Sequence, residues 1–308
     1  MRLGLVSDVH WMAEPPAMTA GWHGTGAELP GALDRLALAF DRFAERDVDL
    51  VVVAGDLAHH GDVGSLAQVL AACTRASAPV LVVAGNHDVD GDADRLARAH
   101  ALAAAPGLSA GAVSLATAAG ELRDGVRVAG VHVGETAGWF GARLRALPDP
   151  AAWGEQPLVL ISHYPVLSLA TAVSEEGFPY PGDLLDRRDL AGLLAARPAP
   201  TLVVGGHVHA RATLADGPVL QLTGGALVEP PYECAVVDVD VPAPGRLAVR
   251  RECVRLREPD GLREPVLAPE REAWLFDGLQ WRTINRGEGH EAEHRQDPDD
   301  ARRQPAAT

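Results

Sequence analysis

Side chains that can bind metal ions follow five separate apolar runs of the sequence. The first three runs are followed by Ser-Asp-Val-His, Gly-Asp and Gly-Asn-His-Asp. The later two are followed by Ser-His and Gly-Gly-His-Val-His. These blocks supply the candidate ligands Asp8, His10, Asp56, Asn86, His163, His207 and His209.

Carboxylate, imidazole and amide groups are ligands for divalent ions such as Mn, Fe and Zn. Seven candidates exceed the needs of one ion. This favours two ions about 3.5–4 Å apart that share a bridging carboxylate. A single histidine at a strand end is an ordinary polar residue, and a single Gly-Asp is an ordinary turn. That explanation fails here, because it would have to hold at five strand ends in succession.

The apolar runs have the length and β-branched composition of strands that are buried on both faces. Strands are predicted at residues 2–6, 49–54, 79–84, 126–131, 157–161 and 201–204, and helices at 31–46, 63–77 and 92–104. This alternation is typical of βαβ units and predicts a largely parallel sheet. Because the carboxyl ends of parallel strands share one edge, the candidate ligands should converge there.

The last third of the chain has a different pattern. Strands are predicted within 213–222, 232–241 and 246–254, with turns at Asp-Gly-Pro and Pro-Ala-Pro-Gly, which indicates an antiparallel end to the sheets. Trp274 and Trp281 are expected to dock on the body. Residues 286–308 are charged and lack aromatic residues, so we predict a disordered tail after a single domain at 1–285.

The composition narrows the possible partners. The chain has 308 residues and a formal net charge of −15, which argues against general affinity for nucleic acid or anionic membranes. Its three cysteines form no CxxC pair, so a disulfide framework or thiolate zinc site is not expected. With no signal peptide and no membrane span in the pattern, we expect a cytoplasmic protein. The oligomeric state is left open.

The ordered blocks Asp8-x-His10, Gly55-Asp56, Gly85-Asn86-His87-Asp88, His163 and Gly206-His207-x-His209 resemble the calcineurin-like metallophosphoesterase superfamily. The resemblance covers residues 1 to about 210 and includes all the motif blocks. It implies an α/β fold of four layers, in which two mixed β-sheets pack face to face between helices.

The same resemblance implies two divalent metal ions bridged by Asp56. One ion would take Asp8, His10 and His209, and the other would take Asn86, His163 and His207. His87 would be the acid that protonates the leaving oxygen, with Asp88 as its orienting partner. A metal-bound hydroxide would attack phosphorus, and no protein nucleophile would be needed.

A small phosphodiester, such as a nucleotide-like one, is the favoured substrate. The Arg that follows Gly-Asp in phosphoprotein phosphatases is absent, and the chain lacks the basic face and extra domains of the related DNA-repair nucleases. Substrate contacts are expected from Tyr164, His59 and Arg211, although Tyr164 and the other loop aromatics could equally serve packing. A phosphomonoesterase, a nuclease and a non-catalytic scaffold remain alternatives, and the metal pair is open among Mn, Fe and Zn.

Overall fold

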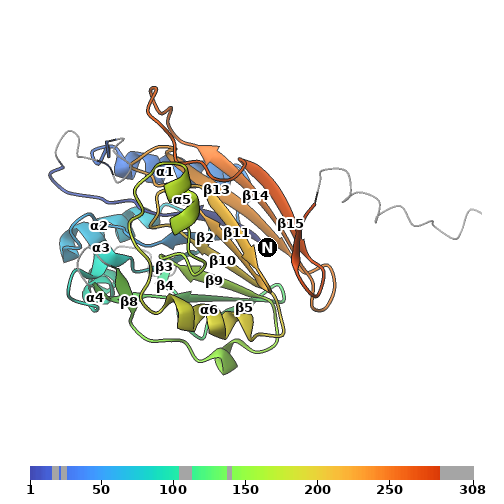
Figure 1. Cartoon of the computed structure of the whole chain (residues 1–308). Coiled ribbons are helices and arrows are strands. Elements are labelled where there is room, and N and C mark those ends of the chain that lie inside the picture. Colours follow the sequence, from blue (N-terminus) through green and yellow to red (C-terminus); the bar gives the residue numbers. More distant parts are fainter. Residues whose placement is uncertain (16–20, 22–25, 104–112, 137–140, 285–308) are drawn as a thin grey trace, which may run out of the picture.

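Two β-sheets form the centre of the protein (Figure 1). The structure is a computed structural model and describes residues 1–15, 21, 26–103, 113–136 and 141–284. The first sheet has eight strands in the order β16-β15-β14-β13-β1-β2-β3-β4. These strands are β1 (Arg2–Val6), β2 (Leu50–Ala54), β3 (Val80–Val83), β4 (Val113–Leu115), β13 (Glu233–Asp240), β14 (Leu247–Arg255), β15 (Arg271–Phe276) and β16 (Trp281–Thr283).

The second sheet has six strands in the order β11-β12-β10-β9-β6-β5. They are β5 (Glu121–Arg123), β6 (Val126–Val131), β9 (Leu158–Ser162), β10 (Thr201–Gly205), β11 (Ala212–Asp216) and β12 (Val219–Thr223). A separate pair joins β7 (Val133–Thr136) to β8 (Ala142–Leu144). Both large sheets combine parallel and antiparallel neighbours, so they are mixed as expected.

The sheets pack face to face because alternate residues of their central strands are apolar on both sides. Leu50 and Val52 of β2 belong to one core cluster with Val159 and Ile161 of β9, which fills the space between the sheets. The intervening Val51 and Val53 instead belong to the cluster that contains the helices. This explains why the strand sequences are continuously apolar instead of alternating.

Helices cover the outer faces and complete four layers (Figure 1). The first sheet is covered by α1 (Ala32–Ala44), α2 (Val63–Cys73) and α4 (Arg95–Ala103), and the second by α6 (Arg187–Ala195). Val173 of α5 (Ala170–Glu175) packs instead on Val208 and Ala212, at the end of the second sheet that carries the loop after β10. Shorter turns are α3 (Asn86–Val89) and the 3-10 turn η2 (Pro150–Trp153). Asp62 begins α2 by accepting a hydrogen bond from the Ser65 N–H at 2.8 Å.

The predicted fold class is therefore confirmed, and the predicted strands and helices are found with small differences at their ends. The helix predicted at 63–77 ends at Cys73, because the chain must become extended before Pro79 and β3. The stretch 213–222 forms the hairpin β11–β12 around Asp-Gly-Pro, where Gly217 has φ +52°. Trp281 docks as expected: it is buried, and its Nε1 donates to the Pro218 carbonyl at 3.0 Å.

Residues 286–308 lie outside the described residues, so the domain boundary and the tail stay predictions. Within the described part of the chain, none of the helices is both long and apolar enough to cross a membrane.

His132, directly after β6, connects the two sheets. Its Nδ1 accepts a hydrogen bond from the Ala84 N–H at 3.0 Å, and its Nε2 donates to the Ala116 carbonyl at 2.7 Å. Ala84 follows β3 and Ala116 follows β4, so one neutral imidazole holds two strand ends of the opposite sheet. Burial lowers the pKa of His132 below its ordinary value of 6.5, because a charged ring would be poorly solvated and would lose the Ala84 bond.

We predict that His132 makes stability dependent on pH. Since its pKa is lower in the folded protein, the unfolded chain binds the proton first as pH falls below about 6.5, and stability is lost by up to about 1.4 kcal/mol per pH unit. His132→Gln retains a donor and an acceptor but cannot be protonated. Urea unfolding at pH 7.5 and pH 5.5 should therefore show a smaller loss of free energy in the variant than in the wild type. An equal loss in both would contradict this role.

Candidate metal centre

The blocks that follow β1 and β2 run side by side and begin the site. The Asp8 N–H donates to the Gly55 carbonyl at 3.1 Å, and the His10 N–H donates to the Asp56 carbonyl at 2.9 Å. The blocks after β3, β9 and β10 come to the same edge: His207 N–H lies 3.2 Å from the Asp8 carboxylate, across 199 residues of sequence. All seven candidate ligands thus lie together, as the strand-end argument predicted.

Five of the seven candidate ligands have left-handed backbones. The φ angles are +55° for Asp8, +45° for His10, +51° for Asp56, +69° for His207 and +49° for His209. This conformation costs about 1–3 kcal/mol at a non-glycine residue, although Asp and His adopt it more readily than most. The strand ends are therefore bent sharply where the ligands sit, and the surrounding contacts must hold them there.

Glycines beside the ligands allow this close packing. A Cβ on Gly85 would lie 2.1 Å from the Asp56 carboxylate oxygen Oδ1. Gly55 has φ +90°, and a Cβ there would meet the His163 ring at 2.6 Å. The Gly-Asp and Gly-Asn-His-Asp blocks thus need glycine because the ligands of neighbouring strands occupy the space where a side chain would be.

Asp8, His10 and His209, here called the Asp8 cluster, offer ligand atoms that lie within 4.8 Å of one another. The Nε2 atoms of His10 and His209 are 3.2 Å apart, and His209 Nε2 is 3.3 Å from Asp8 Oδ1. All three side chains are buried. Two imidazoles and a carboxylate at this spacing can hold one divalent ion.

A second group, the Asp56 cluster, consists of Asp56, Asn86, His163 and His207. His163 Nε2 lies 3.2 Å from both Asp56 Oδ2 and Asn86 Oδ1. The His207 ring centre is 5.2 Å from that of His163. Asp56 Oδ2 also lies 3.7 Å from His10 Nε2, so this carboxylate reaches both clusters.

The protonation of the site reflects the two buried carboxylates. Burial alone would raise the pKa of Asp8 and Asp56, but the imidazoles beside them hold both pKa values below the ordinary range. Burial alone would lower the pKa of His163 and His209, but Asp56 raises the pKa of His163 to about 9 and Asp8 raises that of His209 to about 10. Anionic carboxylates beside imidazoles are the donor set that a divalent ion requires, so the residues fit metal binding.

The imidazoles are oriented by partners behind them. His163 Nδ1 donates to the Ala54 carbonyl at 2.8 Å, which leaves Nε2 for an ion. His207 Nε2 donates to the Gly182 carbonyl at 3.2 Å, which leaves Nδ1. The His207 ring also stacks on Tyr164, with ring centres 3.6 Å apart. Such outer contacts fix the tautomer and direction of a metal-binding histidine.

Glu229 is a site residue that the sequence analysis missed. It is fully buried, and its Oε2 accepts a hydrogen bond from His209 Nδ1 at 2.8 Å. This bond directs His209 Nε2 toward Asp8. The signal in the sequence is an acidic residue between Val228 and Pro230, at the end of an apolar stretch with no other polar side chain to explain it.

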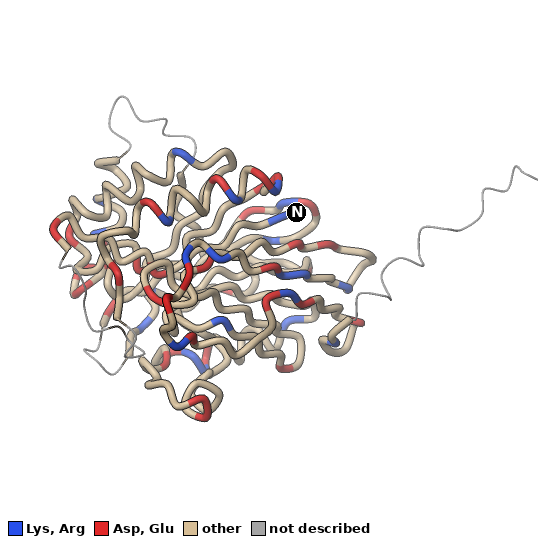
Figure 2. The backbone as a smooth tube through the Cα atoms, turned by 90° about the horizontal axis from the view of Figure 1, so that it is seen from above, with Lys and Arg blue, Asp and Glu red and all other residues tan. Residues whose placement is uncertain are grey.

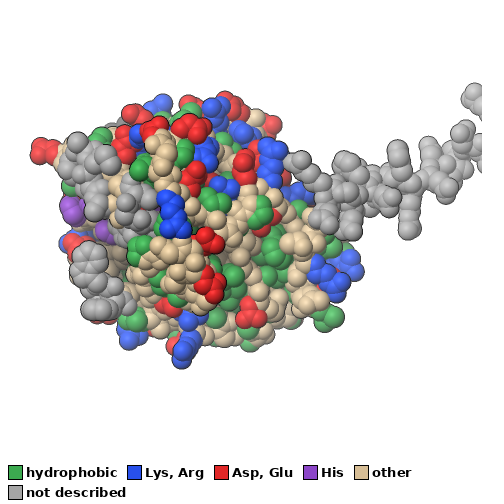
Figure 3. Space-filling view, turned by 45° about the horizontal axis from the view of Figure 1, so that its top comes forward, with side chains coloured by type: hydrophobic (Ala, Val, Ile, Leu, Met, Phe, Trp, Pro, Cys, Tyr) green, Lys and Arg blue, Asp and Glu red, His purple; other side chains and the backbone are tan. Residues whose placement is uncertain are grey.

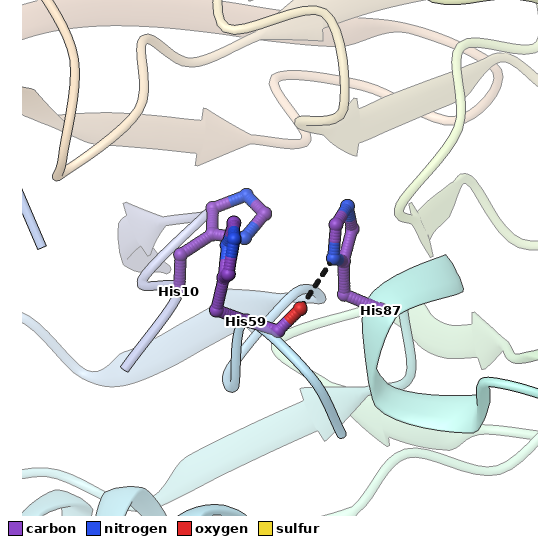
Figure 4. Close-up of side chains that lie close together, drawn as sticks. All are labelled: His10, His59 and His87. Atoms are coloured by element: carbon purple, nitrogen blue, oxygen red, sulfur yellow. Dashed lines mark hydrogen bonds between the residues drawn. The ribbon is translucent and has the colours of Figure 1, made fainter. Parts of the chain in front are cut away.

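His87 and His59 lie at the side of the site beside His10 (Figure 4). His87 Nδ1 donates to the His59 backbone carbonyl, at 2.6 Å, so Nε2 is the ring nitrogen on the side away from this bond. His59, expected as a substrate contact, is half-buried, with its ring centre 5.4 Å from that of His87 and 5.5 Å from that of His10. Burial lowers the pKa of His59 to about 4.

Asp88 has a different position from the one expected. Its carboxylate accepts hydrogen bonds from the backbone N–H groups of Leu57, Ala58 and Gly85, at 2.8, 3.1 and 2.8 Å. The His87 ring is held instead by the His59 carbonyl. Asp88 therefore ties the block after β2 to the block after β3, and orients His87 only through the backbone. Burial and the neighbouring Asp56 raise the pKa of Asp88 to about 7.

Arg211 and Tyr164 are also placed differently from the substrate contacts expected. Arg211 is buried and forms two contacts with Glu233, Nε to Oε1 and Nη2 to Oε2, both at 3.1 Å. A guanidinium paired in this way stabilises the fold, and its hydrogen bond and ion pair are with Glu233 and not with a candidate metal ligand. Tyr164 is only 3% exposed and supports the His207 ring, which favours packing over substrate contact.

The described surface carries both signs of charge. Basic and acidic positions are intermixed along the backbone in Figure 2. Histidine side chains reach the surface on one side of the molecule (Figure 3). Six of the candidate ligands are buried, whereas Asn86 and His87 are half-buried, so the site opens to solvent on the side of these two residues.

Comparison with known proteins identifies one family in sequence and several chains of related structure. The sequence profile of the calcineurin-like phosphoesterases matches residues 1–211. No curated protein matches the chain significantly in sequence. A dimetal phosphatase from Danio rerio has a similar fold, with a TM-score of 0.54 and 14% identity over 83% of this chain and 96% of that one. Yfce, a phosphoesterase from E. coli, matches with a TM-score of 0.36 and 14% identity over 83% of this chain and 100% of that one.

We predict that Glu229→Gln weakens ion binding at the Asp8 cluster by about 10–100-fold, because His209 loses the charged partner that directs it. Isothermal titration with Mn²⁺ measures this affinity. Glu252→Gln, which removes the same charge from β14 outside the site, is the matched control and should bind as the wild type does. Equal affinity of wild type and Glu229→Gln would show that the pair does not act on the ion.

Proposed function

Since the chain belongs to the calcineurin-like phosphoesterase family and is a metal-dependent phosphoester hydrolase, we propose that it acts on a small, nucleotide-like phosphodiester. The observation that carries the choice of diester is the pairing of Arg211 with Glu233. A phosphomonoester has up to two negative charges, and the arginine nearest to the candidate ligands in sequence is already neutralised. A diester has one charge and needs no such cation.

Other arginines around the site are engaged in the same way. Arg95 donates to the Gly61 carbonyl and contacts Asp90 at 3.2 Å, and Arg187 lies 3.4 Å from Asp183. None of the half-buried groups named at the opening, Asn86, His59 and His87, is an arginine or a lysine. The pairing of these arginines supports a substrate with a single charge and a neutral second arm.

We assign the Asp8 cluster to one ion, the rest of the Asp56 cluster to the other, and Asp56 to the bridge between them. The assignment rests on the position of Asp56 Oδ2, which is 3.2 Å from His163 Nε2 and 3.7 Å from His10 Nε2. When bound, two divalent ions polarise the phosphoryl oxygens and lower the pKa of a water molecule for attack. The native ions are proposed to be Mn, Fe or Zn, because imidazole and carboxylate ligands suit these metals.

His87 is proposed as the general acid. Its Nδ1–H donates to the His59 carbonyl, so this proton is held in place. The proton that His87 can donate to a leaving group is therefore the one on Nε2. Donation of the Nε2 proton to the departing alkoxide oxygen would lower the barrier to hydrolysis of a substrate with a poor leaving group. The backbone carbonyl of His59 accepts this hydrogen bond, and the His59 ring lies beside His87. We therefore place His59 next to the leaving group as well.

A nuclease acting on long nucleic acid is the less favoured alternative. Phosphate backbones are bound by clustered Lys and Arg. Among the described residues, arginine positions are interspersed with acidic positions along the backbone (Figure 2). A small-molecule partner, without a membrane or bulk nucleic acid, therefore remains our proposal.

The substrate proposal predicts a higher kcat/KM for a diester than for the matching monoester. An aryl phosphodiester and the corresponding aryl phosphate can be assayed side by side on one Mn-loaded preparation, which keeps the ions constant. Tyr164→Phe is the control, because it keeps the ring stacked on His207 and removes only the hydroxyl. If Tyr164 serves packing, this variant should keep the same ratio of diester to monoester kcat/KM. A clear preference for the monoester would refute the diester assignment while leaving the family membership intact.

For the acid, we predict that His87→Ala retains both ions but slows turnover of a substrate with a poor alkoxide leaving group by roughly 10²–10⁴-fold. The loss should shrink for an aryl leaving group, which needs less protonation. Metal content and both rates can be measured on one preparation. His100→Ala, at a half-buried histidine that contacts the Val113 carbonyl, controls for the loss of an imidazole elsewhere. Loss of metal from His87→Ala would make His87 a ligand instead.

A further inference from the structure

Three imidazoles form a compact group at the opening of the site. His10, His59 and His87, here called the three-histidine cluster, offer ring nitrogens that lie within 4.8 Å of one another (Figure 4). They come from the blocks that follow β1, β2 and β3. His10 belongs to this cluster and also to the Asp8 cluster.

The ring spacing matches a tetrahedral zinc site. With Zn–N distances of about 2.0–2.1 Å and ring centres roughly 1.1 Å beyond the nitrogens, three imidazoles around zinc have centres about 5.2 Å apart. The ring centres here are 4.7 Å apart for His10 and His87, 5.5 Å for His10 and His59, and 5.4 Å for His59 and His87. The planes of the His59 and His87 rings are 24° apart, so one of these rings must rotate for both nitrogens to face one ion.

The hydrogen bond of His87 suits a zinc ligand. A carbonyl oxygen can only accept, so the 2.6 Å contact with the His59 carbonyl fixes the proton on His87 Nδ1. Its Nε2 is then the atom that carries a lone pair when the ring is neutral. A backbone carbonyl behind the ring is the usual outer partner of a histidine that binds zinc.

We propose that the three-histidine cluster is an alternative position for a zinc ion, in competition with the Asp8 cluster for His10. Zinc accepts three imidazoles and a water molecule as a complete ligand set, whereas manganese prefers sites that contain carboxylate oxygen. The Asp8 cluster contains a carboxylate and the three-histidine cluster does not. Zinc can therefore occupy the alternative position, and manganese stays beside Asp8.

The consequence for regulation rests on the proposed function. Zinc bound to His10, His59 and His87 occupies the nitrogen of the proposed acid and withdraws a ligand from the Asp8 cluster. Both effects inhibit hydrolysis. With Mn or Fe as the native pair, the site would thus distinguish an inhibitory zinc ion from the activating ions by ligand chemistry at the same opening.

The test compares affinities, so it does not depend on activity. Isothermal titration of the metal-free full-length chain with Zn²⁺ and with Mn²⁺ is carried out on the wild type and on His59→Gln. We expect the variant to bind zinc at least about tenfold more weakly, because one of three nitrogens is lost, and manganese with less than about a twofold change. His60→Gln is the matched control, since its ring centre lies 4.6 Å from that of His59 but its nitrogen is outside the cluster.

A second readout on the wild type guards against a variant that fails to fold. Zinc is diamagnetic, so ¹⁵N spectra of the histidine rings can be followed during the titration. Zinc should shift the ring nitrogens of His59 and His87. Unchanged zinc affinity in His59→Gln, or a zinc titration that leaves the His59 ring nitrogens unshifted, would overturn the proposal. Neither outcome depends on which phosphoester is hydrolysed, so the diester assay fails or succeeds independently.

Discussion

Two buried carboxylates, Asp8 and Asp56, require positive charge beside them, and the arrangement of the site follows from this requirement. A carboxylate removed from water is strongly destabilised unless it is paired and hydrogen-bonded. In the protein alone, His209 and His163 meet the need, with pKa values of about 10 and 9. Divalent ions meet it more completely and would displace these protons, so ion binding is coupled to proton release.

The fold holds these groups in place through contacts outside the ligand set. Left-handed turns at five ligands are unfavourable locally, and the sheets stabilise them through buried strands and through hydrogen bonds between neighbouring blocks. Asp88, Glu229 and His132 each link segments that are distant in sequence. None of the three touches the reacting atoms in our assignment, yet each restricts where a ligand can point.

Much of the site could be predicted from the sequence because its signal is local. Each ligand block directly follows an apolar run, and the carboxyl edge of a sheet brings such blocks together whatever their separation. The antiparallel strands β13 and β14 were predictable for the same reason. The strands β4, β5 and β8 have only three residues each, too few for a periodic pattern, and were not predicted.

What could not be predicted depends on contacts between distant segments. The pairing of Arg211 with Glu233 spans 22 residues and the bond from His209 to Glu229 spans 20, and no local pattern marks either partner. Asp88 follows His87 in the chain, so the sequence suggested a direct contact. The turn of α3 instead directs the Asp88 carboxylate to the backbone of Leu57 and Ala58.

The central claim is that Asp56 lies between two ion positions. Electron paramagnetic resonance of the protein loaded with two equivalents of Mn²⁺ tests it most directly, because ions about 3.5–4 Å apart that share a carboxylate are magnetically coupled. We predict a coupled dinuclear spectrum for the wild type and its replacement by an isolated Mn²⁺ spectrum in Asp56→Asn. Two uncoupled ions in the wild type, or a coupled pair that persists unchanged in Asp56→Asn, would contradict the account.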